Sequence, residues 1–412
     1  MNASHPLSYI LDISRLLSRA GQRVPTGIDR VELAYARYLI KYHSEQTYFT
    51  ARSLSGKMGA LPKKTVHFFI NSLVRKWNFG NDDGLKKSIK SARYLNAYLF
   101  LSRPLSSIPR PSIYLLLSHH HLMKIKSIQN ILNQTGAFFV PMVHDLIPIE
   151  YPEYARPRES ARHKMRMETV IKLANAVIVP TNPVGDTLKR LYIASGQATP
   201  PIWTIPHGVH EQAMKRFYYA VSSKANKPYF VYISTIEPRK NHLLLLHLWR
   251  KMIKQYGKEN VPELFLIGKR GWENENILDL LDRCPTLQGS VVEASNFSDK
   301  KVTSLLTGSN GLLFPSFAEG YGLPLIEAMS LSVPSICSDI PELREVGGDI
   351  PLYLDPLNTP DWEKAIIDFS QKGALWQKQK ILLENWSPLS WEKSITRSLQ
   401  NCVELTYKNK LF

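Results

Sequence analysis

The 412-residue sequence predicts an α/β fold with two open, mostly parallel sheets. Short apolar runs alternate with segments of helical periodicity, which is the pattern of parallel strands covered by helices. This alternation breaks off after residue 208 and starts again near residue 228. The chain is also longer than one hydrophobic core usually organises. We therefore expect two α/β domains, joined by the polar stretch 209–228 and facing one another across a cleft.

The expected elements follow from the apolar runs in chain order. In the first half, the expected strands are 112–118, 137–145, 175–180 and 202–206. Residues 161–174 predict a helix, because their apolar positions recur at steps of three and four. In the second half, the expected strands are 228–235, 264–268, 289–294, 311–316, 332–338 and 350–355. Ligands of such open sheets bind at the carboxyl ends of the strands, so the loops that follow these runs are the candidate site.

Composition limits the class of protein and its compartment. The apolar content of 44% is that of a globular chain. Three scattered cysteines, Cys284, Cys337 and Cys402, give neither a disulfide framework nor zinc-ligand spacing, so we expect no metal and a reducing cytoplasm. The first 21 residues lack the features of a signal peptide, and no uncharged apolar run approaches the roughly 20 residues of a membrane span. We expect a cytoplasmic protein, soluble or peripheral at the membrane.

The excess positive charge is concentrated in residues 61–110. The chain has a net charge of +17, and this segment holds ten Lys and Arg against two Asp. Its basic residues are interleaved with aromatic residues, namely Phe68, Phe69, Trp77, Phe79, Tyr94, Tyr98 and Phe100. This pattern fits a surface for anionic lipid headgroups, and it fits equally a solvated basic face with core aromatics behind it. No nucleic-acid-binding motif accompanies the charge, so we expect no nucleic-acid partner.

The strongest motif is the stretch 315–329, PSFAEGYGLPLIEAM, which follows an expected strand directly. It holds two carboxylates, Glu319 and Glu327. Its two glycines allow a ligand to approach the backbone closely, and Pro324 suits the first turn of a helix, whose free N–H groups bind phosphate or sugar oxygens. Two solvated glutamates would be the alternative interpretation.

This motif resembles the Glu-x7-Glu signature of the retaining glycosyltransferases of family four, which have two Rossmann-like domains in the GT-B arrangement. Residues 231–249, 264–272 and 341–356 resemble further elements of the C-terminal half of that family. Residues 25–39, 143–154 and 204–210 match its N-terminal half more loosely. The resemblance implies an N-terminal acceptor domain at 1–208, a donor domain at 209–385, and a segment at 386–412 whose helix returns across the domain junction.

The resemblance also implies roles for individual residues. Glu319 would hydrogen-bond the transferred sugar, and Glu327 would hold the ribose hydroxyls. Arg239 and Lys240 would grip the diphosphate and neutralise the charge of the departing nucleotide, which lowers the barrier without a metal. An ordinary basic loop is the alternative for this pair. The other donor-binding residues that the resemblance implies are Gly320, Tyr321, Gly322, Leu323, Gly27, Arg30 and Gly268; Arg30 fits equally a charge that supports the start of a helix.

In the first half, His144 is a candidate catalytic residue, and Asp145 and His119 are candidates for the acceptor side. The resemblance suggests that His144 lies beside the reacting sugar. Asp145 follows it, and His119 begins a run of three histidines after another expected strand. For His144, a buried residue with a purely structural role is the alternative interpretation. For the run of three histidines that interpretation is the preferred one, and three adjacent histidines cannot share one face as metal ligands.

The implied function is retaining transfer of a hexose-type sugar, with mannose as one candidate, from a nucleoside-diphosphate sugar to a glycan or lipid-linked glycan. Cell-surface polysaccharide, including lipopolysaccharide, is the expected product class. The sugar nucleotide is a co-substrate, and no cofactor is expected. Two alternatives stay open: a GT-B sugar-nucleotide epimerase or phosphorylase, and a non-catalytic protein that only binds nucleotide sugars.

Overall fold

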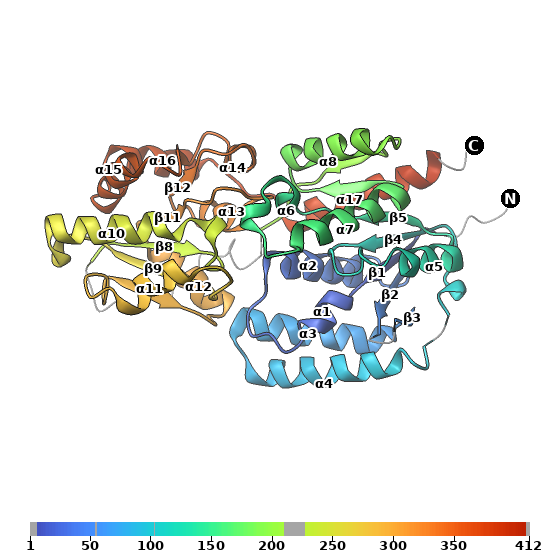
Figure 1. The fold of residues 1–412 in the computed structure, drawn as a ribbon. Coiled ribbons are helices and arrows are strands. Elements are labelled where there is room, and N and C mark those ends of the chain that lie inside the picture. Colours follow the sequence, from blue (N-terminus) through green and yellow to red (C-terminus); the bar gives the residue numbers. More distant parts are fainter. Residues whose placement is uncertain (1–5, 54–55, 103, 210–226, 409–412) are drawn as a thin grey trace. The chain divides into compact units, whose positions relative to one another are not determined.

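The computed structural model describes residues 6–53, 56–102, 104–209 and 227–408. Within them the chain forms two compact units (Figure 1). Unit 1 comprises residues up to Glu150, Pro157–His207 and the end of the chain from Trp391, whereas unit 2 comprises Tyr151–Arg156 and Gly208–Ser390. Nearly all of the stretch 209–228, which the sequence predicts as a linker, lies outside the described residues.

Unit 1 contains a five-stranded sheet in the order β3-β2-β1-β4-β5 and a pair of strands, β6-β7. All neighbouring strands run parallel except β2 and β3. The strands are β1 (Ser8–Asp12), β2 (Thr47–Arg52), β3 (Met58–Ala60), β4 (Ser112–Leu116), β5 (Phe138–Pro141), β6 (Val177–Val179) and β7 (Ile202–Thr204). The helices are α1 (Ser14–Ser18), α2 (Gly27–Tyr42), α3 (Lys63–Phe79), α4 (Asp82–Tyr98), α5 (Ile125–Thr135), α6 (Ile147–Glu150), α7 (Glu159–Leu173), α8 (Asn182–Ser195) and α17 (Trp391–Lys408).

Unit 2 contains a six-stranded, wholly parallel sheet in the order β10-β9-β8-β11-β12-β13. The strands are β8 (Tyr229–Ile233), β9 (Glu263–Ile267), β10 (Val291–Ala294), β11 (Gly311–Phe314), β12 (Ser335–Ser338) and β13 (Leu352–Leu354). The helices are α10 (His242–Tyr256), α11 (Glu275–Arg283), α12 (Asp299–Gly308), α13 (Leu323–Ser330), α14 (Pro341–Gly347), α15 (Thr359–Ser370) and α16 (Ala374–Glu384). Helices cover both faces of the sheet (Figure 1).

The observed strand order indicates where a ligand would be expected. In both sheets the chain starts at a central strand, builds one side and then crosses to the other, as in dinucleotide-binding folds. In unit 2 the crossover lies between β8 and β11, so their carboxyl-end loops are neighbours at the point where the strand order reverses. The motifs after residues 235 and 314 therefore meet at one edge of the sheet.

The structure confirms the predicted α/β class and each of the ten predicted strands. It also contains β1, β2 and β3, which the hydrophobic pattern does not reveal. β3 has only three residues, and β2 carries Thr47, Thr50 and Arg52 among its apolar residues. The C-terminal helix α17 groups with unit 1, where Tyr38 and Thr396 share a hydroxyl–hydroxyl hydrogen bond of 2.8 Å.

The basic segment 61–110 forms the helix pair α3–α4. The sequence allows a surface for lipid headgroups or a basic face with core aromatics behind it, and the aromatic residues divide between the two. Phe69 and Trp77 are in the core, whereas Phe68, Phe79, Tyr94 and Phe100 are exposed. Lys76 is also buried, so it contributes nothing to the basic surface.

Candidate functional site

Three of the predicted donor-site residues meet at the carboxyl ends of β8 and β11. The two strands pair in parallel, with Gly311 beside Phe230. A short 3-10 turn, η3 (Pro238–Lys240), follows β8 and carries Arg239 and Lys240. Glu319 lies in the loop between β11 and α13. The topology therefore places two cations opposite one carboxylate.

The two cations both bind the carboxylate of Glu319. Arg239 donates from Nη1 to Glu319 Oε2 at 3.2 Å, and Lys240 donates from Nζ to Glu319 Oε1. Arg239 also binds the Ala318 carbonyl through Nη1 and Glu237 Oε1 through Nη2, the latter at 2.9 Å. Glu319 is 9% exposed, and the side chains of Arg239 and Lys240 are 17% and 11% exposed. The pairs are thus mostly desolvated, yet both cations retain access to solvent.

The charges of this cluster shift one another's pKa values. Burial alone would raise the pKa of Glu319, but Lys240 and Arg239 lower it to about 2. Burial, together with the neighbouring Arg239, lowers the pKa of Lys240, whereas Glu319 and Glu237 act in the opposite direction. Burial raises the pKa of Glu237, against the effect of Arg239. Glu319 is therefore ionised throughout the physiological pH range and holds two cations at one point.

Backbone contacts fix the two loops to each other. The Phe317 N–H donates to the Arg239 carbonyl at 2.9 Å. The Tyr232 hydroxyl, on β8, donates to the Lys240 carbonyl at 2.6 Å. The positions of both cations are therefore set by the sheet, because these bonds tie their backbone to β8 and to the loop after β11.

Glu327 and the glycine-rich stretch lie on and before α13. Glu327 is half-buried on this eight-residue helix, and Leu323 is its first residue. Gly322 precedes it with a φ of +100°, a conformation that favours glycine, and a Cβ there would lie 2.6 Å from Leu343 Cδ2, so the Leu343 side chain would have to move. Tyr321 is buried with Val209 and Ile326 in a small apolar cluster, and Gly320 is half-buried in the loop.

Gly268 follows β9, beside the end of β8. A Cβ at this position would lie only 1.7 Å from the Ser234 carbonyl oxygen. Glycine is therefore required here by the close approach of two backbones. This packing requirement is a sufficient reason for the residue, and its contact with a donor remains a prediction.

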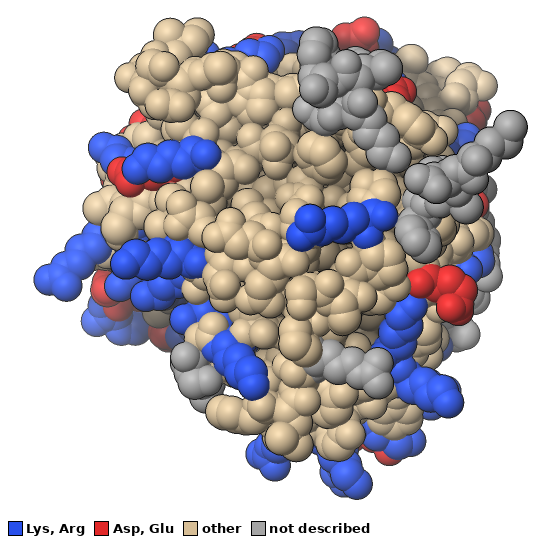
Figure 2. Space-filling view, turned by 90° about the vertical axis from the view of Figure 1, so that its right-hand side faces the viewer, with Lys and Arg blue, Asp and Glu red and all other residues tan. Residues whose placement is uncertain are grey.

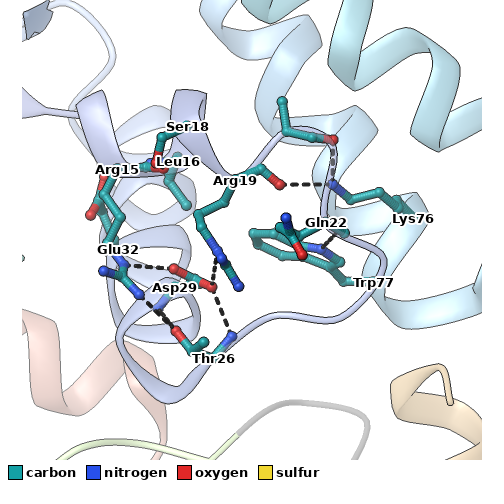
Figure 3. A network of polar contacts seen from close by, with 11 residues as sticks. Arg15, Leu16, Ser18, Arg19, Gln22, Thr26, Asp29, Glu32, Lys76 and Trp77 are labelled. Carbon is teal, nitrogen blue, oxygen red and sulfur yellow. Dashed lines mark hydrogen bonds and ion pairs between the residues drawn. The ribbon is translucent and has the colours of Figure 1, made fainter. Parts of the chain in front are cut away.

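In unit 1, Gly27 is the first residue of α2, and Arg30 lies half-buried in its first turn. Thr26 and Asp29 form a reciprocal capping box, in which the Thr26 N–H donates to Asp29 Oδ2 at 2.8 Å. Asp29 is fully buried and also binds Arg15 Nε at 2.6 Å and Arg19 Nε at 3.1 Å (Figure 3). The start of α2 is therefore fastened to α1 by two ion pairs.

The loop before Thr26 is held by α3 and α4 as well. Lys76 Nζ donates to the Ala20 carbonyl at 2.8 Å, and Trp77 Nε1 donates to the Gln22 carbonyl at 3.0 Å (Figure 3). The Ser88 hydroxyl donates to the same Ala20 carbonyl at 2.9 Å. Burial lowers the pKa of Lys76 to about 7, against the effect of Asp29. Side chains of α3 and α4 thus hold the loop that leads to Gly27.

The predicted catalytic His144 and the predicted acceptor-side His119 lie together in unit 1. The His144 N–H donates to His119 Nε2 at 3.3 Å, and His144 Nε2 lies 2.8 Å from the Leu117 carbonyl, to which it must be the donor. Burial lowers the pKa of both imidazoles, and that of His119 lies well below its ordinary value. Both are therefore neutral at pH 7. Asp145 is half-buried, and its Oδ1 accepts the Ile147 N–H at 3.3 Å, so it supports the start of α6.

Two further histidines belong to this cluster. No local sequence pattern indicates His163, whereas His207 lies in the stretch 204–210 that resembles the family. The ring of His163, on α7, lies 5.0 Å from that of His119, and the ring of His207 lies 5.9 Å from that of His144. Burial lowers the pKa of both. They come from segments far apart in the sequence, so only the fold brings the four imidazoles together. Within the described residues, no group of His, Cys, Asp or Glu is arranged to hold a metal ion.

Comparisons with known proteins agree with the resemblance of the C-terminal half of the chain to glycosyltransferases. Residues 216–384 match the family model described as glycosyl transferases group 1. The chain is 27% identical over 286 residues to the serotype-specific mannosyltransferase WbdA of Escherichia coli, and the match covers 65% of this chain and 34% of WbdA. It is 35% identical over 173 residues to the Escherichia coli O-antigen chain mannosyltransferase B, covering 42% of this chain and 44% of that protein. The chain thus spans about a third of the length of WbdA.

Solved structures agree on the fold of the whole chain. Sucrose-phosphate synthase from Thermosynechococcus elongatus has a TM-score of 0.61 and 15% identity, covering 98% of this chain and all of that one. The Anabaena protein HepE, solved in complex with UDP, has a TM-score of 0.61 and 14% identity over 96% of this chain and all of that one. The chain therefore has the GT-B fold, and its residues 216–384 are similar to the glycosyl transferases group 1 family.

Proposed function

We propose that the protein is a retaining glycosyltransferase that moves a hexose from a nucleoside-diphosphate sugar to a glycan or lipid-linked glycan. The observation that carries the proposal is the binding of Arg239 and Lys240 to Glu319 at the point where the sheet order of unit 2 reverses. The mannosyltransferase names of the relatives support mannose as the sugar and cell-surface polysaccharide as the product class.

In this proposal the diphosphate competes with Glu319 for its two cations. Phosphate oxygens bind Arg and Lys strongly, so the donor replaces the carboxylate as their partner. Glu319 is then released to accept hydrogen bonds from sugar hydroxyls, and Glu327 holds the ribose. The bond between the anomeric carbon and the diphosphate breaks, the acceptor oxygen bonds to the same face of the sugar, and the hydroxyl proton leaves with the nucleoside diphosphate.

The two cations stabilise the transition state because negative charge builds on the departing diphosphate. No metal is assigned a role in this scheme. His144 and Asp145, with His119 behind them, are proposed to line the acceptor side, where a neutral imidazole donates or accepts one hydrogen bond. The domain limits 1–208, 209–385 and 386–412 belong to the same proposal.

Release of nucleoside diphosphate from a panel of nucleotide sugars, with and without glycan acceptors, tests this function. A transferase releases the diphosphate in proportion to the acceptor consumed. An epimerase changes the sugar without an acceptor, a phosphorylase requires phosphate, and a binding protein shows affinity without turnover. Any of these three patterns would contradict the proposal.

We also propose that α3 and α4 bind an anionic membrane surface. Lys64, Phe68, Arg75 and Phe79 are exposed at helical spacing on α3, and α4 exposes further cations together with Tyr94. Figure 2 shows one face on which Lys and Arg are more abundant than Asp and Glu, including its lower part, at the height where Figure 1 places these helices. Within the described residues, none of the helices has the length and apolar character needed to cross a bilayer.

This surface contact is tested by co-sedimentation with phosphatidylglycerol vesicles. Reversing the charge of exposed Lys64, Lys86 and Lys90 should abolish binding, because each cation near such a surface contributes about 1 kcal/mol. The matched control reverses three exposed lysines of unit 2, Lys254, Lys364 and Lys378. Equal loss in both triple variants would indicate a response to net charge alone. The proposed location is peripheral, at the cytoplasmic face of the membrane.

A further inference from the structure

A six-residue segment from the first half of the chain belongs to unit 2. Residues Tyr151–Arg156 group with this unit, although the residues before and after them group with unit 1. The segment contains the 3-10 turn η2 (Pro152–Tyr154). Two of its side chains contact loops that follow strands of unit 2, and both contacts involve aromatic rings.

The first contact is a parallel stack between Tyr154 and Phe317. The ring centroids lie 5.6 Å apart, and the ring planes differ by only 3°. Phe317 stands two residues before Glu319 in the loop after β11. Its N–H is the donor that binds the Arg239 carbonyl. Tyr154 therefore packs on the residue that joins the two loops of the candidate site.

The second contact places Arg156 over Trp272. The guanidinium carbon lies 4.7 Å from the centre of the indole ring, a cation–π geometry. Trp272 lies in the loop after β9, four residues beyond Gly268. In the sheet order, β8 stands between β9 and β11. The segment thus contacts the carboxyl-end loops on both sides of the β8 loop, which carries Arg239 and Lys240.

We infer that the segment Tyr151–Arg156 is part of the nucleotide-sugar site, with Tyr154 and Arg156 as positioning residues. Tyr154 holds Phe317, and through it the backbone that presents Glu319. Arg156 holds the Trp272 loop on the opposite side of the two cations. The inference deepens the proposed function and rests on it. Part of the affinity for the nucleotide-sugar donor would then come from a segment of unit 2 whose neighbours in sequence belong to unit 1.

The test measures binding of UDP and GDP to the full chain by calorimetry. A stacked aromatic pair corresponds to about a 2- to 10-fold change in an equilibrium constant. We expect Tyr154→Ala to weaken nucleotide binding within that range, and Tyr154→Phe, which keeps the ring, to restore it. Glu153→Ala, in the same segment, is the matched control and should bind as the unmodified chain does.

A double-mutant cycle separates positioning from general packing. If Tyr154 acts through Phe317, then Tyr154→Ala and Phe317→Ala should weaken binding by less in combination than the product of their separate effects. Unchanged nucleotide affinity in Tyr154→Ala, with or without a lower melting temperature, would overturn the inference and leave the proposed function intact. If the unmodified chain binds neither UDP nor GDP, both the inference and the proposed function fail.

Discussion

The carboxylate of Glu319 is the residue on which the candidate site depends. It neutralises two partly buried cations that would otherwise lie beside each other without a counter-charge. Their attraction lowers the pKa of Glu319 to about 2 despite its burial. The sequence predicts the three residues but assigns them to separate ligand groups. Their direct pairing could not be predicted, because it depends on the register between β8 and β11.

Replacing Glu319 by Gln should destabilise the protein and abolish transfer. Removal of one partner from a buried ion pair costs about 3–5 kcal/mol, and we expect the lower end because both cations retain some exposure. Nucleotide binding should persist or strengthen, since the diphosphate no longer competes with a carboxylate. Calorimetry and urea denaturation measure the two effects.

The stability difference should also depend on pH. A carboxyl whose pKa is lowered by folding stabilises the native state above its ordinary pKa of about 4.5, and this contribution is lost as pH falls toward 2. The gap between the native chain and Glu319→Gln should therefore narrow from pH 5 to pH 2.5. A gap of constant size would mean that the ion pairs do not stabilise the fold.

Gly268 supplies a prediction that concerns packing alone. An added methyl would lie 1.7 Å from the Ser234 carbonyl, so Gly268→Ala must force β8 and β9 apart. Overpacking of this kind costs about 1–3 kcal/mol or more. Gly21→Ala is the control, because a Cβ at that position would have no atom within 4 Å. Thermal denaturation should separate the two variants, and equal melting temperatures would contradict the close approach.

At the scale of elements, Asp29 joins α1 to α2. It is fully buried, and it holds Arg15, Arg19 and the N-cap of α2. We expect Asp29→Ala to cost about 3–5 kcal/mol, because both guanidinium groups lose their partner. The exposed pair between Arg23 and Asp82 is the matched comparison, and Asp82→Ala should cost at most about 1 kcal/mol. Similar urea midpoints for the two variants would show that the ion pairs of Asp29 with Arg15 and Arg19 do not stabilise the fold.

The histidine cluster makes the stability of unit 1 sensitive to acid. Burial lowers the pKa of His119, His144, His163 and His207, and neighbouring imidazoles lower those of His119 and His207 further. Below pH 6.5 the unfolded chain therefore binds more protons than the native one, so stability is greatest above this pH and is lost as pH falls. Urea midpoints at pH 7.5, 6.5 and 5.5 should decrease, and His119→Gln should flatten the decrease. A midpoint independent of pH would contradict the burial of these rings.

At the scale of the whole molecule, the sequence predicts the architecture well because buried parallel strands are continuous apolar runs. GLLF at β11 and VIV at β6 are such runs, and both follow helices. The sequence pattern does not predict the strands β1 and β2, because they mix Ser, Asp, Thr and Arg with apolar residues. The topological rule then locates the site at the strand ends.

Contacts between segments that are distant in sequence could not be predicted from the sequence. His163 and His207 join the acceptor-side histidines only through the fold. The aromatic residues of the basic segment divide into core and surface according to which helix face packs inward, so Trp77 is buried and Phe79 is exposed. Tyr154 and Phe317 meet over 163 positions of sequence, and nothing local to either residue indicates the pair.

The central claim is that Arg239 and Lys240 bind the diphosphate of a nucleotide sugar. The most direct test is calorimetric titration of the full chain with UDP and GDP, beside Arg239→Ala and the control Lys254→Ala, which removes an exposed cation of α10. Charge-assisted hydrogen bonds contribute about 1.5–3 kcal/mol, so Arg239→Ala should weaken binding by at least tenfold, and Lys254→Ala should leave it unchanged. Equal affinity in Arg239→Ala and the unmodified chain, or no binding of either nucleotide, would contradict the assignment of this site.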